Sequence, residues 1–148
     1  MFRLIGENLR VYTRAMSNSP CYCILLRKAS RRLSALYDEA LAPFGINVGQ
    51  FSHLRNIRRN EPISLTDLAG IMELDRSTVG RNTKVLERMG LVETTSGEDQ
   101  REALLRLSGK GGALLDASQP AWEDVQVKLD ARLGEDRTED LRQLLAAL

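Results

Sequence analysis

The stretch SLTDLAGIMELDRSTVGRNTKVLERMG, residues 64–90, predicts two short helices joined by a tight turn. Ser64 followed by Asp67 is typical of a helix start, because the serine oxygen accepts a free amide proton of the first turn. Apolar residues then recur at helical spacing, and residues 73–75 form the turn. The second helix covers residues 76–89, and Gly90 ends it.

The next segment predicts a β-hairpin. Residues 91–95 and 102–107 have the composition of strands, and the loop SGEDQR separates them. A short helix, a tight turn, a second helix and a hairpin, in this order, make a winged helix-turn-helix. With a preceding helix at about residues 48–59, we expect this unit to span residues 46–108. The predicted fold is mainly α with a small β-hairpin wing, an α+β arrangement.

A further helix is predicted before this unit. Ser19-Pro20 is a helix opening, because proline at the first helical position loses no hydrogen bond. Apolar residues at helical spacing continue to about Leu41. Residues 19–45 are therefore expected to form a helical region before the winged unit. Residues 1–18 are expected to be a flexible arm or an extension from an upstream start site, because Met16 stands just before the helix opening.

Two more helices are predicted after the hairpin. Ser108 caps the first, which we expect to bend or break at Pro120, since proline removes a helical hydrogen bond. Gly134 separates it from a last helix rich in leucine. Residues 109–148 are therefore expected to form a second helical region after the winged unit.

Composition excludes several classes of protein. With 43% hydrophobic and 28% charged residues, the 148-residue chain has enough apolar material for a core. Its net charge of +1 gives no sign of nucleic-acid binding, although residues 1–60 are basic and residues 111–148 acidic. No uninterrupted apolar run suggests a membrane span or secretory signal, so we expect a cytoplasmic protein whose two cysteines are thiols.

The second helix of the central pair has one polar, cationic side. The polar and basic residues of this side recur every three or four positions, opposite Val79 and Leu86. An exposed helix with such a side can enter the major groove of DNA, which is about 12 Å wide. A merely solvated face is the alternative, but the turn before it and the hairpin after it favour DNA. The expected DNA contacts of this helix are Ser77, Thr78, Arg81, Asn82, Lys84 and Arg88.

Several segments resemble the MarR family of bacterial transcription regulators. The resemblance covers residues 21–115 and runs through GINVGQF (45–51), LAGIM (68–72), DRSTV (75–79), LERMGLV (86–92), DQR (99–101) and LSGKG (107–111). It implies a homodimeric repressor on a palindromic operator in double-stranded DNA, with residues 19–45 and 109–148 as its helical dimerisation region. It also implies that Asp99 orients Arg101 of the wing into the minor groove, and that the protein is not an enzyme.

The cysteines suggest a redox signal. Cys21 and Cys23 are placed in the opening turns of the first helix, where free amide groups attract negative charge. Their spacing favours a sulfenic acid, a mixed disulfide or a bond between subunits over a bridge within one helix. Cys23 with Ser30-Arg31 and Leu36-Tyr37 resembles the OhrR-type branch, which implies oxidation by organic hydroperoxides, with Tyr37 holding the thiol. Structural cysteines at a dimer seam are the alternative.

A small aromatic or phenolic effector is the other signal that the MarR resemblance implies, bound between the dimerisation helices and the winged unit. Its expected lining is Tyr22, Tyr37, Phe44, Phe51 and His53, although aromatic residues at helical spacing also form plain core. No cofactor is expected, and one histidine does not suggest a tetrahedral metal site. A winged-helix interaction module without DNA binding would have an acidic or apolar helix face, and a cysteine enzyme would need a base beside the thiol.

Overall fold

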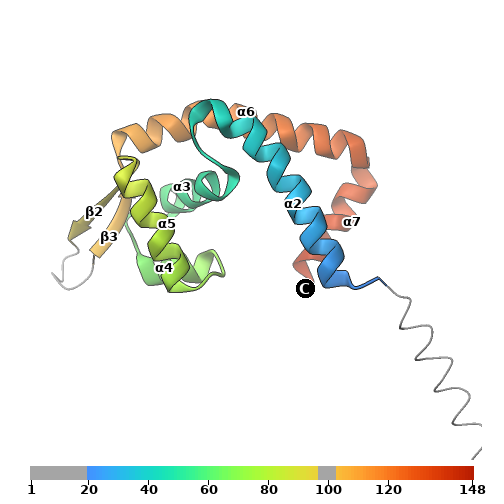
Figure 1. Cartoon of the computed structure of the whole chain (residues 1–148), viewed down its shortest axis with the longest axis horizontal. Helices are drawn as coiled ribbons and strands as arrows, with labels where there is room; N and C mark the ends of the chain where they lie inside the picture. Colours follow the sequence, from blue (N-terminus) through green and yellow to red (C-terminus); the bar gives the residue numbers. More distant parts are fainter. Residues whose placement is uncertain (1–19, 97–102) are drawn as a thin grey trace, which may run out of the picture. The chain divides into compact units, whose positions relative to one another are not determined.

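The computed structural model describes residues 20–96 and 103–148 (Figure 1). The chain divides into two compact units, one ending at Ala35 and one beginning at Leu36, and each is described by itself. Helices dominate, with one small sheet, which confirms the predicted fold class. The elements are α2 (Tyr22–Leu41), η1 (Ala42–Phe44), α3 (Val48–Asn60), β1 (Ile63–Ser64), α4 (Leu65–Ile71), α5 (Arg76–Arg88), β2 (Val92–Ser96), β3 (Ala103–Leu107), α6 (Gly109–Leu133) and α7 (Glu135–Ala146).

The described part of the first unit is the amino-terminal portion of α2. The helix begins at Tyr22, later than the predicted start at Pro20, because the first helical hydrogen bond runs from the Leu25 amide to the Cys21 carbonyl, at 3.0 Å. The predicted cap, Ser19, lies outside the described residues. This portion of α2 exposes a series of large apolar side chains: Tyr22, Ile24, Leu25, Leu26 and Leu33.

In the second unit, α3 lies at the centre and contacts α4, α5, α6 and β3 (Figure 1). Its start is fixed by a capping box that the sequence interpretation missed. The Asn47 side chain accepts from the Gln50 amide at 2.9 Å, and the Gln50 side chain accepts from the Asn47 amide at 3.0 Å. Asp38 of α2 accepts from the next free amide, that of Val48, at 2.7 Å. These bonds satisfy amides that a helix start otherwise leaves unpaired.

The sheet has three antiparallel strands in the order β1-β3-β2. The predicted hairpin is β2 and β3, paired from Val92 opposite Leu107 to Ser96 opposite Ala103. Strand β1 was not predicted, because a strand of only Ile63 and Ser64 is too short to show alternation. It pairs with β3 at Ile63 and Leu105 and so attaches the hairpin to the start of α4.

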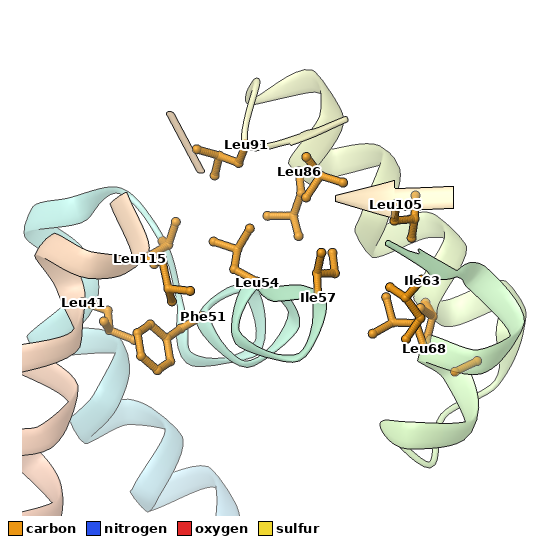
Figure 2. Packing of buried hydrophobic residues seen from close by; sticks show 14 residues of the cluster. Leu41, Phe51, Leu54, Ile57, Ile63, Leu68, Leu86, Leu91, Leu105 and Leu115 are labelled. Carbon is orange, nitrogen blue, oxygen red and sulfur yellow. The ribbon is translucent and has the colours of Figure 1, made fainter. Parts of the chain in front are cut away.

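One hydrophobic core joins the sheet to the helices of the second unit. Figure 2 shows Leu54 and Ile57 of α3 facing Leu86 of α5, with Leu105 of β3 close by. Leu54, Ile57 and Leu86 have no exposed surface. The buried members of this cluster are Leu41, Ile46, Phe51, Leu54, Ile57, Ile63, Leu68, Ala69, Val79, Leu86, Leu91, Val92, Leu105 and Leu115.

Helix α6 runs unbroken from Gly109 to Leu133, so of the predicted bend or break at Pro120 the break is wrong. Proline at this position deprives only the carbonyl four residues earlier of its amide partner. That carbonyl belongs to Asp116, which is exposed, so water can replace the missing donor. The break occurs instead at Gly134, whose φ of 84° separates α6 from α7, as the sequence predicts.

Candidate nucleic-acid interface

Helix α5 has one buried and one exposed side, as its residue spacing predicts. Val79 and Leu86 have no exposed surface and Thr83 retains 4%. On the other side, the predicted residues Ser77, Arg81, Asn82, Lys84 and Arg88 are exposed, and Thr78 is half-buried. The Arg81 guanidinium donates to the Thr78 hydroxyl at 3.3 Å, which holds it along the helix surface. The exposure of this side is thus confirmed, whereas its contact with DNA stays a prediction.

The exposed side of α5 is electrostatically positive. Within residues 20–96 and 103–148, no ion pair joins its arginines or its lysine to a carboxylate. Arg76, which the sequence interpretation omitted, is also exposed and donates to the Thr66 hydroxyl of α4 at 3.3 Å. A hollow of about 330 Å³ beside the helix includes Arg76 and Lys84 in its lining. Unpaired cations beside a concave surface favour an anionic partner.

Glu87 is the acidic residue within α5. It is half-buried, and the Thr94 hydroxyl of β2 donates to its carboxylate at 2.5 Å. This bond holds the carboxylate beside β2, and Glu87 also lines the hollow that includes Arg76 and Lys84. The bond also joins α5 to β2, the first strand of the hairpin.

A buried hydrogen bond holds α5 on α3. The Nε2 atom of His53 lies 2.9 Å from the Thr83 hydroxyl, and His53 is only 1% exposed. Burial lowers the pKa of His53, because a charged imidazole is disfavoured away from water. Its Nδ1 atom has no partner among the described residues. A neutral histidine of α3 therefore supports the buried side of α5.

The end of α5 is joined to the start of α6. Lys110 donates to the carbonyl of Met89 at 2.8 Å, and the Ser108 hydroxyl donates to the carbonyl of Gly90 at 2.6 Å. Gly90 has a φ of 72°, the left-handed conformation that the sequence predicts for this helix end. Gly111 lies so close to the carbonyl of Leu91 that a Cβ atom there would be 1.9 Å from its oxygen. The position of α5 is thus coupled to that of α6.

The turn between α4 and α5 has an unusual conformation. Glu73 adopts a φ of 52°, a left-handed value that glycine tolerates better than other residues. The Leu74 amide donates to the carbonyl of Ala69 at 3.1 Å and closes the turn. Asp75 stands at the start of α5, as predicted, but its side chain makes no capping hydrogen bond. Ser64 does cap α4, accepting from the Asp67 amide at 3.1 Å.

The wing residues expected to reach the minor groove, Asp99 and Arg101, lie outside the described residues. The paired strands β2 and β3 lead directly to that segment. The predicted role of the two residues stays a prediction.

The predicted redox residues fall in different units. Cys21 and Cys23 are free thiols and exposed, just before and within the first turn of α2. Tyr37 belongs to the second unit and is 9% exposed. Its hydroxyl accepts from the Gln126 side chain at 2.5 Å, and burial, followed by the negative charge of Asp130, raises its pKa.

The predicted effector residues have different surroundings and do not line one common cavity among those described. Phe51, 1% exposed, stacks on Trp122 at 5.6 Å between ring centroids, and Tyr37 stacks on the same indole at 6.2 Å. These two rings therefore contribute to internal packing. Phe44 is half-buried in η1, His53 lines a small cavity of about 130 Å³ beside α5, and Tyr22 is 77% exposed.

Neither a metal-binding group nor a membrane-spanning helix is found in the described ranges. No group of histidine, cysteine and acidic residues there could hold a metal ion. None of the described helices combines the length and apolarity needed to cross a membrane.

Comparison with known proteins completes the description of this site. The model of the MarR family matches residues 46–103. The transcriptional regulator MosR of M. tuberculosis, solved in complex with DNA, is 35% identical, with 86% of this chain and 96% of that one covered and a TM-score of 0.76. A mutant MarR from E. coli, complexed with operator DNA, is 26% identical, with 83% and 89% covered and a TM-score of 0.78. An uncharacterised transcriptional regulator of Bacillus subtilis, YwoH, is 28% identical, with 70% of this chain and 71% of that one covered.

Proposed function

The chain belongs to the MarR family of transcription regulators, and from this premise we propose that it is a homodimeric repressor that binds a palindromic operator. The observation that carries this proposal is the exposed cationic side of α5, whose arginines and lysine form no ion pair within residues 20–96 and 103–148. Arginine can bind guanine edges in two places at once, and lysine and arginine neutralise backbone phosphates. Its relatives MosR and MarR have been solved with DNA, which supports the same partner here.

Exposed apolar side chains support a dimer. Helix α7 leaves Leu144 67% exposed and Leu145 50% exposed, and Leu148 follows at 90%. A groove of about 540 Å³ between the end of α2 and α6 is lined by apolar residues such as Leu36 and Val125 and by charged ones such as Lys128. A second copy covering these surfaces would remove apolar area from water. Two-fold symmetry would then give two α5 helices for two half-sites about one helical turn apart.

Oxidation of Cys23 is the release signal that we propose. Both cysteines are exposed in the single chain, so a hydroperoxide can reach them there. A thiol would attack the O–O bond, becoming a sulfenic acid while the peroxide leaves as an alcohol. The aromatic effector has less support, because Tyr37 and Phe51 are packed against Trp122. It remains the second candidate, although the α2–α6 groove that could hold a small aromatic molecule is lined by none of the predicted effector residues and is covered in the proposed dimer.

The DNA-binding proposal is tested by a gel shift on the DNA upstream of the gene. We expect Arg81→Ala to weaken binding by about 1–3 kcal/mol, the value of one good base contact. Arg137→Ala is the matched control, since Arg137 is an exposed arginine of α7. Equal affinity of the wild type and Arg81→Ala at moderate salt would disprove the role of α5.

The release proposal is tested on the same complex. Cumene hydroperoxide should release the wild type, dithiothreitol should restore binding, and Cys23→Ser should be insensitive. Cys21→Ser separates the two thiols. Release by phenol alone, unchanged in both cysteine variants, would instead favour the aromatic effector.

A further inference from the structure

We propose that three arginines of α3 form a binding site for a small oxyanion at the junction of α3 and α6. Arg55, Arg58 and Arg59 are spaced by three and four residues, so they share one side of the helix. Together with Leu115, Asp116 and Gln119 of α6 they line a hollow of about 240 Å³. No residue of α5 belongs to this lining, so the site is separate from the cationic side of the recognition helix.

The hollow has more positive than negative charge. Its one carboxylate, Asp116, pairs with Arg58 at 2.9 Å between Oδ1 and Nη1. In the part of the chain that the structure describes, neither Arg55 nor Arg59 has an ion pair. Burial, followed by the charge of Arg59, lowers the pKa of Arg55 despite an opposing effect of Glu123. An anion between the guanidinium groups would relieve this repulsion.

One of the guanidinium groups is held in place before any ligand binds. The Arg55 guanidinium lies 4.3 Å from the centre of the Trp122 ring, a cation–π contact. The indole in turn stacks on buried Phe51. A fixed guanidinium loses little freedom on binding, and its planar fork matches the two oxygens of a carboxylate or phosphate group. The volume lies below the range of about 300–1,000 Å³ typical of larger ligands, which favours a small oxyanion.

The oxyanion site also adjoins the contact between the first turn of α6 and the segment that follows α5. Arg58 donates to the carbonyl of Gly112 at 3.3 Å, in the first turn of α6. The preceding residue, Gly111, is the one packed on the carbonyl of Leu91 just after α5. An oxyanion that draws Arg58 away from Gly112 and Asp116 would therefore alter the support of the recognition helix. This regulatory consequence rests on the proposed function, whereas the binding of the anion does not.

Isothermal titration of the full-length protein tests the site without DNA. The probes are inorganic phosphate, pyrophosphate and citrate, each in chloride buffer of matched ionic strength, so that phosphate and carboxylate sources are compared. We expect at least one probe to bind, and Arg59→Gln to weaken it by about tenfold, the loss of one charge-assisted hydrogen-bonding group. Arg137→Gln controls for net charge. Arg59 lacks an ion pair in the described ranges, so its replacement leaves the fold intact, which the melting temperature will verify.

Three results would overturn the site: no binding of any probe, equal binding by the wild type and Arg59→Gln, or loss of binding in Arg81→Gln instead. A gel shift with the tightest probe then tests the regulatory step. The probe should change the DNA affinity of the wild type at least threefold and leave that of Arg59→Gln unchanged. If the anion binds but DNA affinity does not move, the regulatory step is wrong. If the wild type binds no DNA at all, the proposed function fails while the anion site stands.

Discussion

Gly111→Ala is the perturbation that most directly tests the joint between α5 and α6. An added Cβ atom would lie 1.9 Å from the carbonyl oxygen of Leu91 and 2.8 Å from its carbon. Both are backbone atoms, so no side-chain rotation can relieve the clash. The first turn of α6 must therefore move away from the segment that follows α5.

The cost can be worked from the bonds that this movement disturbs. Overpacking costs about 1–3 kcal/mol. The Ser108 amide donates to Leu91 at 3.1 Å and the Ser108 hydroxyl to Gly90 at 2.6 Å, and each bond contributes about 1 kcal/mol. Alanine recovers about 1 kcal/mol of helix propensity over glycine. We expect a net loss of about 2–4 kcal/mol of unfolding free energy.

Gly112→Ala is the matched control in the same turn. Its Cβ atom would meet only Nη1 of Arg58, at 3.7 Å, an ordinary contact. This variant should gain about 0.5–1 kcal/mol. Urea unfolding followed by circular dichroism, at one fixed protein concentration, measures both variants. If Gly111→Ala is as stable as Gly112→Ala, the close packing of α6 on Leu91 is wrong.

Three further predictions concern helix ends and the buried histidine. Glu73→Gly should raise the unfolding free energy by about 1 kcal/mol, since it relieves a left-handed conformation; a melting temperature that falls would contradict this. Asn47→Ala should lower it by about 1 kcal/mol through loss of the capping box, which chemical denaturation would detect; no change would mean that Gln50 alone suffices. Because burial lowers the pKa of His53, only the unfolded chain gains a proton just below pH 6.5, so stability is full above that pH and falls as the pH decreases. Unfolding free energies at pH 7.5 and 5.5 should therefore differ more for the wild type than for His53→Gln, and equal differences would refute the assignment.

Much of the fold could be predicted because its signals are local. The buried side of α5 follows from the spacing of Val79, Thr83 and Leu86, and Gly90 marks the end of the helix. The confirmed fold class rests on the order of these elements. The strand that could not be predicted depends on a partner that is distant in the sequence. Strand β1 exists only through its pairing with β3, and proline alone does not decide whether α6 breaks at Pro120.

The candidate site could be predicted in part for the same reason. Exposure of Arg81 and Lys84 is a property of helix periodicity and needs no tertiary information. The stacking of Trp122 on Tyr37 and Phe51 joins residues far apart in the sequence, which periodicity does not predict. The sequence does not identify the arginines of α3 as a site, because a charged helix side is usually only exposed to solvent. Only their hollow with α6 and the contact of Arg55 with Trp122 distinguish them.

Hydroxyl-radical footprinting of the upstream DNA tests most directly whether two α5 helices read one duplex. We predict two protected patches related by a two-fold axis, with centres about 10 base pairs apart, the spacing of successive major grooves on one side of the helix. At the lowest protein concentration that fully protects with the wild type, protection by Arg81→Ala should fall in both patches together. A single unsymmetrical patch, or protection that persists in Arg81→Ala, would contradict the account.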